Sequence, residues 1–173
     1  MANTFVKIAS ATVGSGGAAS IDFTSIPSTY TDLCVLLSLR GDAASSYNDS
    51  YVQFNNDTAG NYSMCRLYGT GSSTASDSLT SGANFGRVGS SVGSTSTSNT
   101  FANVMIYIPN YTGSTAKSFM SDGVTENNGS GAFAVLYADL WSGTAAISTV
   151  KIFGLSTNFV QYSTATLYGI KKS

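Results

Sequence analysis

Three carboxylates are the residues of this 173-residue chain with the clearest potential for catalysis. Asp122 and Glu126 lie in the stretch KSFMSDGVTENNG, and Asp139 lies in LYADLW. Two carboxyl groups about 5 to 10 Å apart can hydrolyse a glycosidic bond, one as an acid and the other as a base or nucleophile. Glu126 stands beside the turn-forming residues 127–129, however, and solvated carboxylates in turns are far commoner than catalytic ones. We expect no hydrolysis from these residues.

The chain contains no histidine, which excludes the commonest forms of nucleophilic catalysis. Neither a Ser-His-Asp nor a Cys-His arrangement can form, and a zinc site built on imidazole is excluded as well. The glycine-rich segments do not show the pattern of a phosphate-binding loop between a strand and a helix. The sequence therefore predicts a protein that is not an enzyme and that holds no cofactor.

Oxygen ligands of the kind that calcium prefers are concentrated in and around the stretch SYNDSYVQFNNDTAGN. They are Asp42, Asn48, Asp49, Asn55, Asn56 and Asp57. Their spacing does not match that of an EF-hand loop, and turns rich in Asn and Asp account for them more simply. We expect no metal site here.

Charged side chains are scarce, at 10% of the residues, and the net charge is -1. Such a surface has little charge with which to hold a nucleic-acid backbone or an anionic membrane. Ser, Thr, Gly, Asn and Tyr take the place of charge, which suits a protein that packs in many copies. The first residues do not resemble a secretion signal, and no stretch is long enough for a membrane-spanning helix, so we expect a soluble protein made in a cytosol.

Four stretches alternate apolar and polar residues with a period of two, which indicates half-buried strands. They are DLCVLLSLR with Leu33, Val35, Leu37 and Leu39 on one face, FANVMIYIPN with Val104, Ile106 and Ile108, STVKIFGL with Val150 and Ile152, and TATLYGIKK with Leu167. Six shorter runs look alike, namely FVKIASATV, SIDFTSI, YVQFN, YSMCRLYG, KSFMSDGV and AFAVLYADLW. Turn residues separate these runs, and amphipathic helix patterns are almost absent. The sequence predicts an all-β fold, a sandwich or a barrel, and we expect a single-domain antiparallel β-sandwich over residues 1–173.

The segment from Gly69 to Thr100 differs from the rest because it is dominated by Ser, Gly and Thr. Only Leu79, Phe85, Val88 and Val92 could pack into a core. We therefore expect a long surface excursion over about 69–100 with one weak strand around 85–92. A loop of that length is usually functional or mobile, and a neighbouring subunit could order it.

Cys34 and Cys65 both fall in apolar runs, so the simplest expectation is two small buried side chains. A disulfide between them stays open at this stage. The tripeptide Arg40-Gly41-Asp42 matches a cell-adhesion signal, but Gly-Asp followed by small residues is also how strands ordinarily end. Because a three-residue match occurs often by chance, we favour the turn.

Aromatic residues make up 12% of the chain. We expect Phe and Trp to fill the core, including Phe23, Phe54, Phe133 and Phe153. Tyr47, Tyr51 and Tyr111 stand beside turns and are therefore predicted to contact a partner. An exposed aromatic such as Tyr51 or Trp141 could instead stack on a sugar.

Four segments, in this order, carry a family resemblance that spans almost the whole chain: SIDFTSIPSTYTDLCVLLSLRGD, YVQFNNDTAGNYSMCRLYGTGSS, LWSGTAAISTVKIF and FVQYSTATLYGIKKS. They resemble an apolar-F-x-x-I-P-x-x-Y-x-x-L opening, an F-N-x-D-x-x-x-N-Y middle and a closing A-x-L-Y-G-I-K in a group of tailed-bacteriophage virion structural proteins. Proteins of this type are jelly-roll-like modules that serve as capsid decoration (cement) proteins or as parts of tail fibres. In them an Arg-Gly pair commonly closes the third strand, so the resemblance implies that Asp42 completes the adhesion tripeptide incidentally.

The resemblance implies a structural role in the virion, assembled in the host cytoplasm. The first strand begins within a few residues of Met1 and no stalk precedes it, so we expect a free-standing decoration protein that binds the major capsid protein as a homotrimer. The alternative is a tail-fibre, tail-tip or head-fibre module that binds a host receptor or surface glycan. The predicted contacts are edge strands, turn tyrosines and the two chain ends, with the end residues Asn3, Thr4, Phe5, Lys171 and Lys172.

Overall fold

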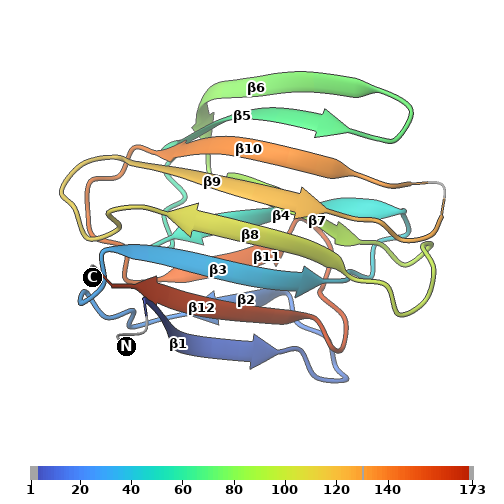
Figure 1. Ribbon diagram of the computed structural model, residues 1–173, viewed down its shortest axis with the longest axis horizontal. Coiled ribbons are helices and arrows are strands. Elements are labelled where there is room, and N and C mark those ends of the chain that lie inside the picture. The colour runs from blue at the N-terminus through green and yellow to red at the C-terminus, as the bar shows by residue number, and fades with distance from the viewer. Residues whose placement is uncertain (1–3, 130, 172–173) are drawn as a thin grey trace.

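The computed structural model describes residues 4–129 and 131–171, which form twelve strands and no helix (Figure 1). The strands are β1 (Phe5–Thr12), β2 (Ser20–Phe23), β3 (Asp32–Leu39), β4 (Tyr47–Phe54), β5 (Tyr62–Gly69), β6 (Thr74–Ala83), β7 (Gly86–Val92), β8 (Ala102–Ile108), β9 (Lys117–Val124), β10 (Ala134–Trp141), β11 (Val150–Gly154) and β12 (Thr164–Ile170). Within these described ranges no helix is long and apolar enough to cross a membrane.

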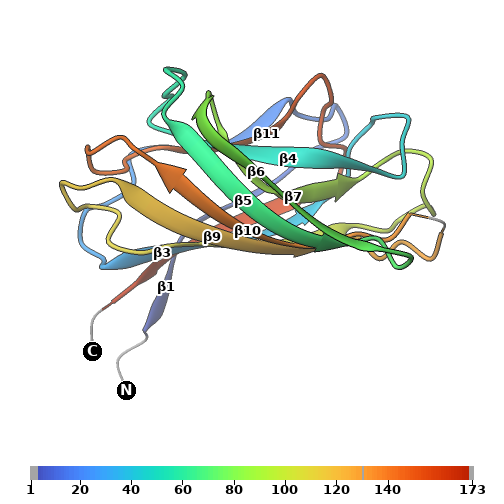
Figure 2. The ribbon, with the colours of Figure 1, turned by 90° about the horizontal axis from the view of Figure 1, so that it is seen from above.

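The strands form two antiparallel sheets that pack face to face, which confirms the predicted β-sandwich. The large sheet has eight strands in the order β1-β12-β3-β8-β9-β10-β5-β6, and the small sheet has four in the order β2-β11-β4-β7. The half-sheet β1-β12-β3-β8 stacked on β2-β11-β4-β7 has the strand order of a jelly roll. The pairs β9-β10 and β5-β6 then extend the large sheet beyond this unit, and Figure 2 shows how strongly the extended sheet twists.

The predicted alternation of β3 and β8 is confirmed by their burial. Leu33, Val35 and Leu39 are fully buried, as are Val104, Ile106 and Ile108. The pairing of Val35 with Ile106 sets the register that turns both sets toward the small sheet. Val150, Ile152 and Leu167 are buried in the same core, as expected from the period of two in their strands.

An aromatic cluster occupies the core beneath β9 and β10. The ring of Phe54 on β4 lies 5.0 Å from that of Phe119 and 5.7 Å from that of Trp141, both in edge-to-face geometry. Tyr62 lies beside them, and its hydroxyl accepts a hydrogen bond of 2.8 Å from the backbone N–H of Phe54. The cluster therefore ties β4 of the small sheet to β5, β9 and β10 of the large sheet. The burial of Phe23, Phe54 and Phe133 agrees with the prediction that phenylalanines fill the core, whereas Phe153 is only half-buried.

The segment 69–100, expected to be a long surface excursion with one weak strand, is more regular than the sequence indicated. It contains two strands: β7, which matches the predicted weak strand and is almost entirely buried, and β6, which the sequence did not indicate. Nine of the ten residues of β6 are exposed, so its side chains carry no alternation that a sequence pattern could detect.

The two cysteines do not behave alike. Cys34 is buried on β3, as expected, but Cys65 on β5 is exposed, so the prediction that both are buried is wrong. Both thiols are free. They lie on the same side of the large sheet with β8, β9 and β10 between them, about 19 Å apart at ordinary strand spacing, which is far beyond the reach of a disulfide.

Removing the central ring of the core should be costly. We expect Phe54→Ala to lower the free energy of unfolding by about 3–5 kcal/mol, because it leaves a cavity between Phe119 and Trp141. Urea unfolding curves measure the change. The matched control is Leu67→Ala, at a side chain that is 60% exposed, where a change within about 0.5 kcal/mol is expected. A cost below about 1 kcal/mol for Phe54→Ala would contradict this description of the core.

Candidate functional site

In the tripeptide Arg40-Gly41-Asp42, the side chains of Arg40 and Asp42 form hydrogen bonds with other segments of the same chain. The Arg40 guanidinium donates hydrogen bonds to backbone carbonyls of the loop after β7, including that of Thr97 at 2.8 Å. The Asp42 carboxylate accepts from the Thr157 hydroxyl at 2.7 Å and from the Asn158 backbone N–H at 2.8 Å. These bonds, that of Thr157 first, hold the pKa of Asp42 below its usual range. Both side chains thus fasten loops to the end of β3, which supports the structural interpretation of this stretch.

The three carboxylates considered for catalysis do not converge. Asp122 is exposed on the side of β9 that faces away from the small sheet, whereas Asp139 is buried on the opposite side of β10. Glu126 lies in the following loop, where its Oε1 accepts a hydrogen bond of 2.8 Å from the backbone N–H of Asn128. The sheet itself separates Asp122 from Asp139, so the pair has no common substrate position.

The most extensive feature of the surface is an apolar face on the large sheet. We call it the outer face: the side of β3, β8, β9, β10 and β5 that points away from the small sheet. Its large apolar side chains are 38–60% exposed. They are Leu36, Met105, Met120, Val124, Leu136, Leu140 and Leu67. In an antiparallel sheet with one side in water, these positions are usually polar, so this face departs from the usual pattern.

The strand register brings these side chains into rows. Leu36 pairs with Met105, Met105 pairs with Asp122, Asp122 pairs with Leu136, and Leu136 pairs with Leu67. Directly paired residues point to the same side, so four apolar side chains and one carboxylate cross five strands in a line. At ordinary strand spacing the five strands present about 500 Å² of surface, which is as large as the patches that mark protein interaction sites on monomers.

Two open hollows lie on the outer face. The larger, of about 560 Å³, lies over β5, β9 and β10 and is lined by Leu67, Val124 and Leu136 among others. The smaller, of about 350 Å³, lies next to it between Leu36, Met105 and Asp122. Apolar hollows of this size accept large side chains from a partner protein, and such anchors supply most of the affinity in many interfaces.

The outer face has a signal in the sequence, namely apolar residues at strand positions that alternate with the buried ones. In β3, Leu36 lies out of phase with its buried neighbours Val35 and Leu37, at a position expected to face solvent. Met105 and Met120 are out of phase with the buried residues of β8 and β9 in the same way. Strands covered on both sides usually carry apolar residues in both phases, whereas strands with one side in water usually alternate. The alternation showed the buried side correctly, and the second apolar phase corresponds to the exposed apolar side chains of the outer face.

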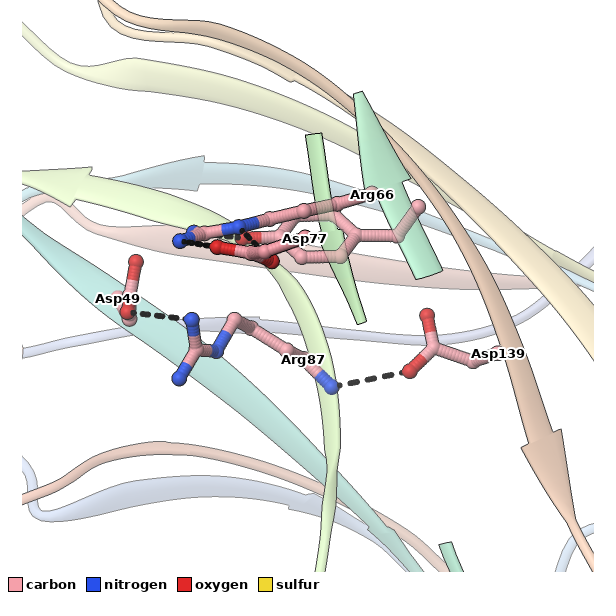
Figure 3. A network of polar contacts seen from close by, with 6 residues as sticks. Asp49, Arg66, Asp77, Arg87 and Asp139 are labelled. Carbon is pink, nitrogen blue, oxygen red and sulfur yellow. Dashed lines mark hydrogen bonds and ion pairs between the residues drawn. The ribbon is translucent and has the colours of Figure 1, made fainter. Parts of the chain in front are cut away.

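A network of charged and aromatic side chains lies on the other side of the same strands (Figure 3). Arg66 on β5 forms a two-point ion pair with Asp77 on β6, at 2.7 and 2.6 Å. The guanidinium also lies 4.6 Å from the centre of the Tyr68 ring and donates a hydrogen bond to the Tyr137 hydroxyl. Such paired and stacked contacts are among the strongest that a guanidinium makes, and here they join β5, β6 and β10.

A second pair lies at the edge of the small sheet, next to the first. Arg87 on β7 contacts Asp49 on β4 at 3.4 Å. The backbone N–H of Arg87 donates a hydrogen bond of 3.2 Å to Oδ1 of Asp139 on β10 (Figure 3). An acidic side chain of the large sheet thus caps the edge of the small sheet.

Asp139 is buried at this junction and incompletely paired. The residue is 2% exposed, and its Oδ2 has no hydrogen-bond partner among the described residues. Burial raises the pKa of Asp139 to about 8, because the charged form loses its hydration while only the Arg87 N–H and the more distant Arg87 charge favour it. At neutral pH the group is therefore mainly a neutral acid.

The tyrosines predicted to contact a partner are mostly engaged inside the protein. Tyr111 is fully buried, with its hydroxyl donating to the carbonyl of Pro27, and Tyr51 is 7% exposed and packs on Phe85. These two predictions are wrong, because turn residues beside each tyrosine do not prevent its ring from pointing inward. Tyr47 is half-buried and stacks on Phe133, with the ring centres 4.9 Å apart.

The other predicted contact residues lie at the chain ends. Phe5 is 55% exposed on β1. Thr4 and Lys171 are exposed next to each other, and the backbone N–H of Lys171 donates to the carbonyl of Thr4 at 2.9 Å. Asn3 and Lys172 lie outside the described residues. Thr4, Phe5 and Lys171 therefore lie close together beside the edge strand β1 of the large sheet.

Four of the residues weighed as calcium ligands, Asp42, Asp49, Asn55 and Asp57, have side-chain partners within the chain. Asp57 accepts hydrogen bonds from the Asn61 amide at 2.8 Å and from the Trp141 indole N–H at 2.6 Å. Asn55 uses its side chain to bind the backbone of the segment before β11. In the part of the chain that the structure describes, no three acidic or cysteine side chains gather into a metal-binding group. These residues are accounted for as turn and loop fasteners.

Comparison with models of protein families, with curated proteins and with solved structures finds no match to this chain.

The buried acid should make the stability of the protein depend on pH. In the unfolded chain an aspartate ionises near pH 3.8, whereas the folded chain holds the Asp139 proton up to about pH 8. Between these values the folded state binds the extra proton, so the free energy of unfolding falls as pH rises, by up to about 1.4 kcal/mol per pH unit. Asp139→Asn cannot ionise and should remove this part of the slope, as measured by urea unfolding from about pH 4.5 to about pH 8.5.

Asp122→Asn is the matched control for Asp139→Asn, because it removes a carboxylate from the exposed side of the neighbouring strand. It should leave the pH slope of the wild type unchanged. Equal slopes for the wild type and Asp139→Asn would show that Asp139 is ionised in the folded protein.

Proposed function

We propose that this protein is a structural subunit of a phage virion, a decoration protein that binds the assembled capsid and stabilises it by bridging neighbouring capsid subunits. The observation that supports this proposal best is the outer face, where apolar side chains of five adjacent strands are exposed together. The order of the four sequence segments that resemble tailed-phage virion proteins supports a virion role, and for a decoration protein the partner is the major capsid protein.

The chemistry of the outer face suits a contact between proteins. Its apolar side chains are Leu, Met, Val and Ala, whose removal from water is favourable by about 25 cal/mol for each Å² of apolar surface. Asp122 near its middle fixes orientation, because a carboxylate that loses water on binding needs a donor on the partner. Asn103 also lines the smaller hollow, so polar groups lie among the apolar side chains of this face.

Capsid stabilisation follows from binding to the assembled shell alone. A ligand that binds one state and not the other stabilises it by RT ln(1 + [L]/Kd), so free decoration protein holds the shell in its assembled form. On a lattice, each copy that bridges two subunits gains from the high effective concentration of the second contact. Modest affinity at each outer face is then sufficient.

The alternative function is a tail-fibre, tail-tip or head-fibre module that binds a host receptor or surface glycan, and two aromatic residues, Tyr51 and Trp141, were considered as platforms for a sugar. Trp141 is 3% exposed and Tyr51 is 7% exposed, so neither offers a ring on which a sugar could stack. The outer face, with its aliphatic side chains, suits a protein partner better than a hydroxyl-rich ligand. Binding to a glycan array would favour the tail module over the capsid.

A charge placed in the larger hollow should weaken binding to capsids. We expect Leu136→Lys, at a side chain that is 48% exposed, to weaken binding to expanded, undecorated capsids of the encoding phage at least tenfold, because an ammonium group would lose water without a partner. Co-sedimentation with capsids measures binding, and the melting temperature of the capsids measures stabilisation.

The control for Leu136→Lys is Leu155→Lys, at a side chain that is 46% exposed in the loop after β11 and away from the outer face. It should bind like the wild type, and both variants should unfold at the wild-type denaturant concentration. A wild-type protein that does not bind capsids contradicts the proposed function. Capsid binding that neither substitution affects would place the docking surface elsewhere.

A further inference from the structure

The two sheets have four edge strands in the described part of the chain: β1 and β6 on the large sheet, and β2 and β7 on the small sheet. An edge strand presents unpaired backbone N–H and C=O groups, and proteins usually protect such edges against pairing with other chains. The protection is commonly a charge, a bulge, a short strand or a covering element. The four edges of this protein differ in whether they have one.

Three of the edges are protected. β1 carries a bulge between Lys7 and Ala9 and exposes the charge of Lys7. β2 is only four residues long and exposes Asp22. β7 is covered by the large sheet, since the Arg87 backbone N–H is bound by Asp139 of β10. Each of these devices opposes pairing with a foreign strand.

β6 has none of these devices over most of its length. It is ten residues long with nine of them exposed, and its sequence TASDSLTSGA contains neither proline nor lysine. From Thr74 to Leu79 its register with β5 is continuous, and the shift comes only beyond that point. Its one charge, Asp77, is already neutralised by the two-point pair with Arg66. The free edge of β6 is therefore open and regular from Thr74 to Leu79, and its one carboxylate is paired within the chain.

We propose that β6 pairs antiparallel with β6 of a second copy of this chain, so that two large sheets become one continuous sheet. The side chains of β6 are mostly small, so they form few pockets for the side chains of a foreign strand. Such pockets give strand addition its specificity, so β6 is poorly suited to select a different protein. A two-fold axis needs no such pockets, since each copy presents the same surface to the other. A net charge of -1 leaves little repulsion between copies.

The register of such a pair is restricted by Asp77. Pairing centred on Asp77 would place like charges directly opposite each other, which is destabilising. Pairing centred on Ser78 places Asp77 opposite Leu79 and keeps the two carboxylates apart. It also leaves Ser78, which shares the outer side of the sheet with Cys65, facing its own copy across the axis. The two outer faces then lie on the same side of one extended sheet.

The experiment needs only the purified protein, so its outcome is independent of whether the capsid is the partner. Sedimentation velocity over a wide range of concentrations should show a monomer that converts to a dimer. Ser78→Lys and Ser78→Asp should each be monomeric at concentrations where the wild type is dimeric, because each places like charges across the axis. An equimolar mixture of the two variants should restore the dimer, since opposite charges then face each other.

Ser10→Lys is the matched control, because it adds the same charge at an exposed, outward-facing position on β1, the other edge of the large sheet. It should dimerise like the wild type. Far-ultraviolet circular dichroism and urea unfolding check that every variant is folded. A wild type that stays monomeric, a trimer of the kind the family resemblance implies, or a dimer unaffected by Ser78→Lys would each overturn the proposal.

Discussion

The unequal size of the two sheets is the constraint on which the rest of the structure depends. Four strands cannot cover eight, so the small sheet covers the jelly-roll half of the large sheet and ends at β7, against β8, β9 and β10. The strands beyond that boundary, β5 and β6, have no second layer over their full length. They are stabilised there by a small second hydrophobic cluster that includes Tyr68 and Tyr137. The guanidinium of Arg66 joins these two rings to Asp77. The inner side of the extension is thus polar and aromatic, and the outer side is aliphatic.

The same boundary explains the position of Asp139. It lies where the edge of the small sheet meets the large sheet, and a backbone N–H at that edge would be unpaired without it. A carboxyl group is a costly way to satisfy one N–H in a buried site, because its second oxygen is left without a partner. The same contact therefore pairs the Arg87 N–H at the sheet edge and keeps the Asp139 carboxyl group in a buried, incompletely hydrogen-bonded position.

The core could be predicted from the sequence, and the outer face and the β6 edge largely could not. The alternation in β3, β8, β11 and β12 follows directly from burial on one side, so a period of two was sufficient to identify both the strands and the residues that pack. β6 was not predicted because it is exposed on both sides, so its sequence shows no alternation of apolar and polar residues. Tyr111 was misplaced because a neighbouring turn says little about which way a ring points. The contacts of Arg66 and Asp139 depend on which strands become neighbours, and that information is absent from any single segment.

The exposed thiol of Cys65 gives the outer face a natural reporter. Cys34, the second cysteine of the chain, is buried, and burial together with the nearby Asp122 charge raises its pKa, so it reacts slowly with electrophiles. A maleimide dye would therefore attach selectively to β5, beside the larger hollow, without any engineered residue. The emission of the dye would change when another molecule covers that surface. Cys65 could therefore serve as a native labelling site that reports whether the outer face is occupied.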